Sequence, residues 1–157
     1  MSIKFIRIDD RLIHGQVVTA WIKNYQAKKI LIIDDQVAAD SFLINVLKMV
    51  APSGIELRIE GTDNLTQLIA EYEADDKNTV LLMKTPQTAQ KVFDSGAILR
   101  ALNVGGMGAS KTRKNLYKNV SASDDEVAVL KVMEDAGIRV YFQATPNDKQ
   151  IDLKNLK

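Results

Sequence analysis

A short run of branched apolar residues follows Lys29 in the segment Lys29-Ile30-Leu31-Ile32-Ile33 and stops before Asp34-Asp35. A run this short and this apolar is typical of a parallel strand whose two faces are both covered. Similar runs recur along the chain and alternate with segments of helical period. This alternation predicts an α/β fold with a mostly parallel sheet. The expected strands are Ile3–Ile8, Lys29–Ile33, Ile55–Ile59, Thr79–Met83, Leu99–Val104 and Ile138–Gln143, with a weaker candidate at Lys118–Ser121.

Apolar residues at helical spacing occupy the segments between these strands, and they predict the faces that turn toward the core. In the first helix, Trp21 is expected to be a core residue. In the second helix, which Pro52-Ser53-Gly54 closes, the expected inward face comprises Phe42, Leu43, Val46, Leu47 and Val50.

Capping signals predict where the later helices begin and end. Further helices are expected to start at Thr62–Asn64, at Thr85-Pro86 and at the capping box Ser123–Glu126, with a stop at Gly137. The polar tail, Asn147–Lys157, is expected to form a surface arm or a short helix.

Composition narrows the function classes. The 157 residues match one ordinary domain, so residues 1–157 are expected to form a single domain. A net charge of +1 argues against nucleic acid as the main partner. The absence of cysteine and the single histidine exclude thiolate zinc sites, cysteine nucleophiles and two-histidine mechanisms, so no metal is expected. No signal peptide or membrane span is recognisable, which predicts a cytoplasmic protein.

Ligands of open α/β sheets bind at the carboxyl ends of the strands, because strand-to-helix loops and helix N-termini gather there. This rule selects six loops, which the sequence alone does not order in space. They begin near Asp9, Asp34, Gly61, Lys84, Gly105 and Ala144.

The loop after the first strand contains the only histidine, His14, directly before Gly15. A nucleophilic histidine here could carry a phosphoryl group held by helix N–H groups and by the forked guanidinium of Arg11. Asp9 or Asp10 could orient the imidazole through its other nitrogen, or both could only cap a turn.

The segment Arg7–Val17 resembles the active-site signature of the IIB component of mannose/sorbose-type sugar phosphotransferase systems, and Asn103–Met107 resembles a second loop of that family. The resemblance extends over essentially the whole chain. It implies that His14 is phosphorylated at Nδ1 and that Arg11 binds the phosphate. From their places beside His14, Asp10 and Gly15 are also predicted to bind or orient the phosphohistidine.

The same resemblance implies an open, doubly wound, mostly parallel sheet of about seven strands with one antiparallel edge and helices on both faces. The expected partners are a phosphorylated IIA donor, the membrane IIC and IID components and a sugar, with peripheral association at the membrane and no cofactor. It leaves a homodimer open and does not identify the sugar.

Several other residues at the carboxyl edge have a functional and a structural interpretation. Gly105-Gly106 either forms a turn or lets backbone approach the phosphohistidine, with Met107 as an apolar partner contact. Asp34 either lines the crevice or caps a helix, and Lys84-Thr85 either adds a cation and a hydroxyl or forms a helix start. The basic stretch Lys111–Lys114, with Lys118, is either a solvated face or a docking surface for a phosphorylated partner.

Two other functions compete with the carrier. A phosphohistidine phosphatase would need a second histidine, which the chain lacks. A non-enzymatic nucleotide- or metabolite-binding module could use the Gly105-Gly106 loop with His14 incidental. The first loop lacks the G-x-G-x-x-G pattern, which makes a dinucleotide site improbable.

Overall fold

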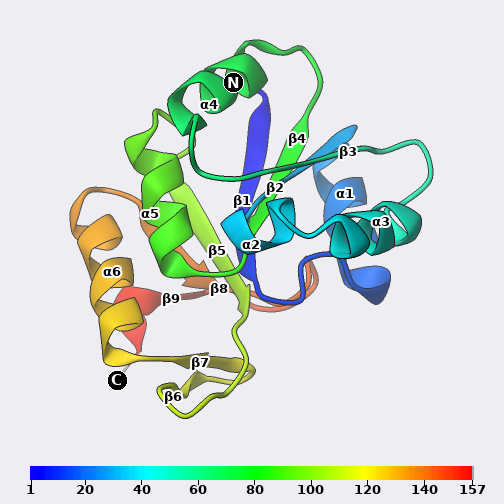
Figure 1. The fold of residues 1–157 in the computed structure, drawn as a ribbon. Coiled ribbons are helices and arrows are strands. Elements are labelled where there is room, and N and C mark those ends of the chain that lie inside the picture. The colour runs from blue at the N-terminus through cyan, green and yellow to red at the C-terminus, as the bar shows by residue number, and fades with distance from the viewer. Residues whose placement is uncertain (157) are drawn as a thin grey trace.

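The computed structural model describes residues 1–156, and Lys157 lies outside the described residues. Within this range a seven-stranded sheet has the order β3-β2-β4-β1-β5-β8-β9 (Figure 1). All neighbours pair in parallel except β8 and β9. The strands are β1 (Ile3–Asp9), β2 (Lys29–Ile33), β3 (Glu56–Glu60), β4 (Thr79–Met83), β5 (Ala101–Gly106), β8 (Arg139–Phe142) and β9 (Ile151–Asp152).

Helices cover both faces of this sheet. The helices α1 and α3 pack on one face, and α4, α5 and α6 pack on the other (Figure 1). The bounds are α1 (Gly15–Tyr25), α2 (Asp35–Ala38), α3 (Ser41–Val50), α4 (Leu65–Ala74), α5 (Pro86–Asp94) and α6 (Asp124–Asp135), with a 3₁₀ turn at Leu153–Asn155. None of the helices formed by residues 1–156 has the length and apolar character needed to cross a membrane.

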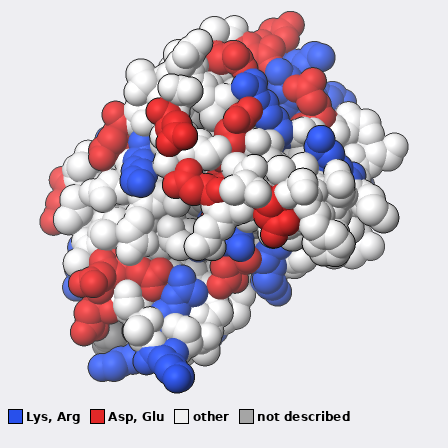
Figure 2. Space-filling model, in the orientation of Figure 1, with Lys and Arg blue, Asp and Glu red and all other residues white. Residues whose placement is uncertain are grey.

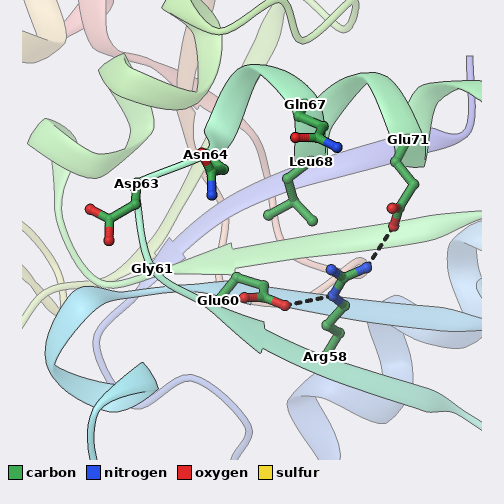
Figure 3. Close-up of a pocket in the computed structure, with 8 residues that line it drawn as sticks. All are labelled: Arg58, Glu60, Gly61, Asp63, Asn64, Gln67, Leu68 and Glu71. Atoms are coloured by element: carbon green, nitrogen blue, oxygen red, sulfur yellow. Dashed lines mark hydrogen bonds and ion pairs between the residues drawn. The ribbon is translucent and has the colours of Figure 1, made fainter.

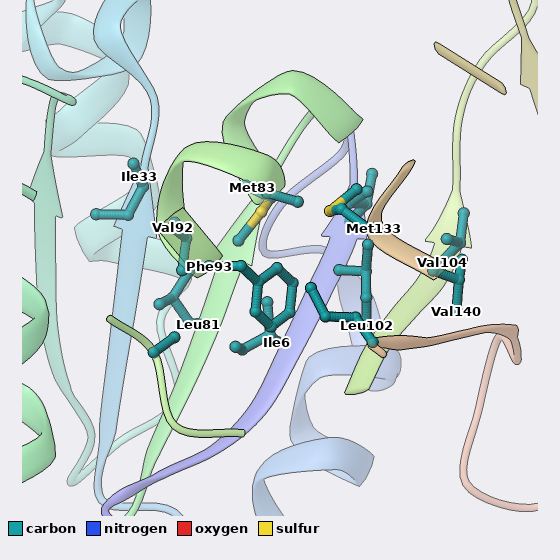
Figure 4. Close-up of a cluster of buried hydrophobic side chains, with 14 of the residues drawn as sticks. Ile6, Ile33, Leu81, Met83, Val92, Phe93, Leu102, Val104, Met133 and Val140 are labelled. Atoms are coloured by element: carbon teal, nitrogen blue, oxygen red, sulfur yellow. The ribbon is translucent and has the colours of Figure 1, made fainter. Parts of the chain in front are cut away.

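Two apolar clusters, one on each face, form the core. Successive strand residues point to opposite faces, so Ile30 and Ile32 join the cluster beneath α1, while Leu31 and Ile33 join the cluster beneath α4, α5 and α6. Figure 4 shows part of the second cluster, with side chains of the strands meeting those of α5 and α6. Trp21 is buried in the first cluster, as predicted. The open, doubly wound, mostly parallel sheet predicted from the sequence is confirmed.

The predicted element boundaries agree closely with the structure. The six expected strands all lie in the main sheet, and two of them, β2 and β4, match to the residue. Ser123 and Glu126 form the expected capping box. Thr85 caps α5.

Two strands, β6 of a small second sheet and β9, were not predicted from the sequence. The weak candidate at Lys118–Ser121 becomes β7 (Val120–Ala122), which pairs antiparallel with β6 (Lys114–Tyr117). In the polar tail, a short 3₁₀ helix forms at Leu153–Asn155, in line with one of the two expected forms, and the unexpected strand β9 precedes it.

The predicted inward face of α3 is correct in part. Leu47 is buried and Leu43 and Val46 are half-buried, whereas Phe42 is 75% exposed and Val50 is 52% exposed. The helix is apolar around most of its circumference, so periodicity could select the buried side only in part. It packs next to the outermost strands, where the sheet can cover only one narrow side of the helix.

Candidate functional site

The loop from β1 to α1 is a tight turn anchored in the core. The amide of Leu12 donates to the carbonyl of Asp9 at 2.9 Å, and Leu12 has a left-handed backbone with φ of 58°. The buried side chains of Leu12 and Ile13 hold the turn down. Because a left-handed conformation is strained for a branched residue, this burial is what stabilises it. His14 follows as the N-cap of α1, and Gly15 begins the helix with φ of 50°.

His14 and Asp9 form the central contact of the site. The His14 Nε2 atom lies 3.0 Å from Oδ2 of Asp9. Asp9 is completely buried, and the His14 side chain is 22% exposed. The hollow beneath His14, lined in part by Arg7, Leu12 and Trp21, is too narrow to admit a water molecule. The imidazole therefore has one nitrogen held against a completely buried carboxylate, where a hydrogen bond is strong.

Two arginines also bind the Asp9 carboxylate. The Arg7 Nη2 atom donates to Oδ2 at 3.0 Å, and the Arg11 backbone amide and Nε donate to Oδ1 at 3.1 and 3.3 Å. Burial acts to raise the pKa of Asp9, but the charge of Arg7 and the hydrogen bonds from His14 and Arg11 outweigh it, so this pKa lies below its ordinary value. An ionised carboxylate only accepts hydrogen bonds, so His14 Nε2 must carry a proton. In the neutral form of the ring, the lone pair is then on Nδ1.

The expectation that Asp10 orients the imidazole is wrong. Its Oδ2 accepts from the backbone amide of Gly108 at 2.7 Å and from Arg113 at 3.4 Å. Asp9 is the last residue of β1, whereas Asp10 lies in the turn that follows, where the strand no longer fixes the side-chain direction. Asp10 therefore ties the β1 loop to the segment after β5, while Asp9 contacts His14.

Groups suited to an anion surround the exposed side of His14. The Arg11 side chain is 55% exposed, which leaves guanidinium donors accessible beyond those that contact Asp9. The helix α1 has no acidic residue in its first turn, and the first backbone N–H groups of a helix have no intrahelical partners. A Cβ on Gly106 would lie 3.2 Å from Asp9 Oδ1 and 3.3 Å from Arg11 Nη2, so glycine leaves room here.

Two residues of the glycine-rich segment do not act as expected. Gly105 is buried and faces the guanidinium of Arg7, which a Cβ at this position would overlap, so it does not line a partner surface. Met107 is 1% exposed and belongs to the core. Its backbone forms a β-bridge with Val120. It is therefore unavailable as a docking contact.

The remaining predicted crevice residues have structural roles or lie to the side. Asp34 accepts from the amide of Val37 at 2.9 Å and caps α2, and β4 separates its strand from β1. Thr85 accepts from the amide of Thr88 and caps α5. Lys84 follows β4, the neighbour of β1, and so lies on the same edge of the sheet as His14.

A polar hollow of about 370 Å³ lies between β3 and α4, away from this site (Figure 3). Arg58 crosses it and pairs with Glu60 at 2.7 Å and with Glu71 at 2.5 Å. The strand β3 is the outermost strand, and β2 and β4 lie between it and β1. This hollow is therefore no part of the His14 site, and its cation already has acidic partners.

Arg7 contacts the His14 site through Asp9, and the sequence patterns assigned it no role. It is 2% exposed in the middle of a strand whose neighbouring residues are apolar. An arginine inside an apolar strand run is a feature of the sequence that could have pointed to the site, because a buried charge needs polar partners. The strand alternation adds that Arg7 and Asp9 point to the same face.

Comparison with known proteins defines the class. The model of the sorbose-subfamily IIB component of the phosphotransferase system matches residues 3–157. The chain therefore belongs to this family and is a component of a sugar phosphotransferase system.

Individual relatives agree over nearly the whole chain. The fructose-specific EIIB component of Bacillus subtilis is 28% identical over 97% of this chain and 93% of the relative. The mannose-specific EIIAB component of Escherichia coli is 28% identical over 99% of this chain, which spans 48% of that longer protein. The crystal structure of the IIB domain of the sorbose permease of Klebsiella pneumoniae superposes with a TM-score of 0.91, at 27% identity, over 98% of this chain and 94% of that one.

Proposed function

We propose that His14 is the residue of this IIB component that carries the phosphoryl group, and that it does so on Nδ1. The observation that supports this is the 3.0 Å contact between His14 Nε2 and the buried carboxylate of Asp9. With Nε2 occupied, Nδ1 is the nitrogen that can attack phosphorus. Histidine in this arrangement is a nucleophile that a third group orients.

The reaction is an exchange of one P–N bond for another. The lone pair of His14 Nδ1 attacks the phosphorus of a phosphohistidine on the donor, and the bond from phosphorus to the donor nitrogen breaks with its electrons. Arg11 and the first N–H groups of α1 balance the charge of the phosphoryl oxygens. Asp9 accepts from Nε2–H and stabilises the ring as it becomes bonded at Nδ1. Positioning and charge are the main contributions that such a loose transition state needs.

The full activity proposed is that of a protein-N(pi)-phosphohistidine–sugar phosphotransferase, with residues 1–157 acting as one phosphocarrier domain. A phosphorylated IIA component is the donor, which the fusion of IIA and IIB in the mannose-specific relative supports. The membrane IIC and IID components present the sugar that receives the phosphoryl group. The carrier would thus work in the cytoplasm and meet the membrane through its permease.

The test is phosphorylation of the purified chain by phosphoenolpyruvate, the general phosphotransferase proteins and a mannose-family IIA component. Intact mass and phosphopeptide mapping are expected to find one acid-labile phosphoryl group on His14 and none on a folded His14→Gln variant. Phosphorylation of the variant would move the carrier residue elsewhere. No phosphorylation of the wild type with several IIA donors would favour the binding-module interpretation.

A further inference from the structure

The guanidinium of Arg7 joins several elements directly beneath the proposed phosphorylation site. Its Nη1 donates to Asn103 Oδ1 at 2.7 Å and to the carbonyl of Gln143 at 3.1 Å, and its Nη2 donates to Asp9 Oδ2 at 3.0 Å. It also lies over the ring of Trp21, 5.5 Å from the centroid. Partners on β1, β5, α1 and the segment after β8 therefore fix its position.

Gly105 provides the space for this guanidinium. A Cβ at residue 105 would overlap the carbon and both terminal nitrogens of the Arg7 guanidinium. The backbone of Gly105 is not in the left-handed region, so a turn does not explain the glycine. Residue 105 must therefore be glycine because any larger side chain would collide with the guanidinium of Arg7.

One carboxylate oxygen connects this guanidinium to the imidazole. Asp9 Oδ2 accepts from Arg7 Nη2 and meets His14 Nε2, both at 3.0 Å. Arg11 Nη2 also donates to this oxygen, at a longer 3.4 Å, so Arg7 makes the shorter of its two guanidinium contacts. The guanidinium approaches from the buried side and the imidazole from the partly exposed side. A shift of Arg7 would therefore move or turn the oxygen that holds His14.

We propose that Arg7 is a positioning residue for phosphoryl transfer and that Gly105 is the glycine that permits it. Arg7 holds Asp9 Oδ2 toward His14 Nε2, and this keeps the proton on Nε2 and the lone pair on Nδ1. The inference rests on the proposed role of His14. It adds that a residue that does not touch the phosphoryl group selects the reactive nitrogen.

The experiment measures the imidazole itself, so it needs no phosphoryl donor. Nitrogen-15 NMR of His14 in the unphosphorylated protein reports the share of the ring that carries its proton on Nε2. We expect the Nε2–H form to dominate in the wild type and to lose population in Gly105→Ala and in Arg7→Lys. Phosphorylation by the IIA donor should slow about 10-fold or more in both variants, the loss expected when a charge-assisted hydrogen bond is disturbed.

Two controls separate positioning from general damage. Gly61→Ala places a Cβ 2.8 Å from Asp35 Oδ1 at the end of β3, so it crowds a carboxylate far from His14 and should leave the tautomer unchanged. In the double variant, the slimmer lysine leaves room for the new Cβ. Gly105→Ala should therefore lower the phosphorylation rate and the Nε2–H population much less in an Arg7→Lys background than alone.

The outcomes are separable. A wild-type tautomer and rate in folded Gly105→Ala, or costs that simply add in the double variant, would overturn the proposal. If Gly105→Ala does not fold, Arg7→Lys decides: a loss of the Nε2–H form supports the proposal, and a wild-type tautomer overturns it. A wild type whose ring shows the expected tautomer but never becomes phosphorylated would instead count against the proposed function.

Discussion

Adjacent aspartates at the end of β1 show how much one position matters at the residue scale. Asp9 is completely buried and binds His14, Arg7 and Arg11, whereas Asp10 binds Gly108 and Arg113. Their chemistry is identical and only the side-chain direction differs. The proposed carrier site is therefore built on a strand residue, which a rigid sheet holds, rather than on the loop residue beside it.

Arg11 supplies the exposed guanidinium, and its fork of donors should matter more than its charge. Arg11→Lys keeps the charge but cannot donate in the same planar geometry, so phosphorylation by the IIA donor should slow about 10-fold or more. Single-turnover rates at saturating donor check this. The His14 tautomer should change less than in Arg7→Lys, because the shorter contact from Arg7 Nη2 and the backbone amide of residue 11 still hold Asp9. A rate equal to that of the wild type would remove Arg11 from phosphate binding.

At the element scale, the β6–β7 hairpin adds positive charge next to the site. Lys111, Lys114 and Lys118 are exposed on and beside it, and blue side chains gather at the lower tip of Figure 2, where the hairpin lies in Figure 1. The hairpin is fastened to the end of β5, because Asn119 donates to the carbonyl of Gly105 at 2.9 Å. Its charge is thereby held close to the His14 loop.

We expect this hairpin to speed the encounter with a negatively charged, phosphorylated donor. The double variant Lys114→Glu/Lys118→Glu should lower the association rate about 10-fold at low ionic strength, and less in salt, because screening weakens such steering. Stopped-flow transfer measured at several salt concentrations tests this. Lys77→Glu, just before the amino end of β4, changes the charge at the opposite edge of the sheet and should have little effect. Equal effects of the two changes would leave the hairpin without a docking role.

At the scale of the whole molecule, partly buried ion pairs link separate elements. Glu126 at the start of α6 binds Arg113 through two contacts of 2.9 and 2.8 Å, and Arg113 also reaches Asp10. Burial acts to raise the pKa of Glu126, but Arg113 and the capping interactions with Ser123 lower it below its ordinary value of 4.5. This pair joins the β6–β7 hairpin, α6 and the β1 loop into one unit.

The lowered pKa of Glu126 predicts an acid-sensitive contribution to stability. The ionised carboxylate stabilises the fold above its unfolded pKa, and that contribution is lost as the pH falls through the lower folded pKa. Glu126→Gln should therefore be less stable than the wild type at pH 7, and the gap should narrow toward pH 3. Urea unfolding at several pH values checks this. Asp135→Asn, an exposed change on the same helix, should leave the pH dependence of stability as in the wild type. If the stability difference between the wild type and Glu126→Gln stays constant from pH 7 to pH 3, the lowered pKa of Glu126 is contradicted.

Local patterns predicted most of the fold, because strand and helix periods depend on near neighbours in the chain. The run Lys29–Ile33 predicted a strand covered on both faces, and its alternate residues do enter two different clusters. The face of α3 was only partly predictable in this way. Which side of an apolar helix is buried depends on the width of the sheet beneath it, and Phe42 is exposed for that reason.

The sequence by itself determined the α/β class, the family and the position of His14 at the end of the first strand. Only the tertiary structure decided that Asp9 holds the imidazole, that Gly105 makes room for Arg7 and that Met107 lies in the core. The first contact depends on the direction of a side chain around a turn, and the second depends on β1 and β5 lying side by side. Spacing along the chain specifies neither the strand order nor the direction of a side chain in a turn, and both depend on how the whole sheet packs.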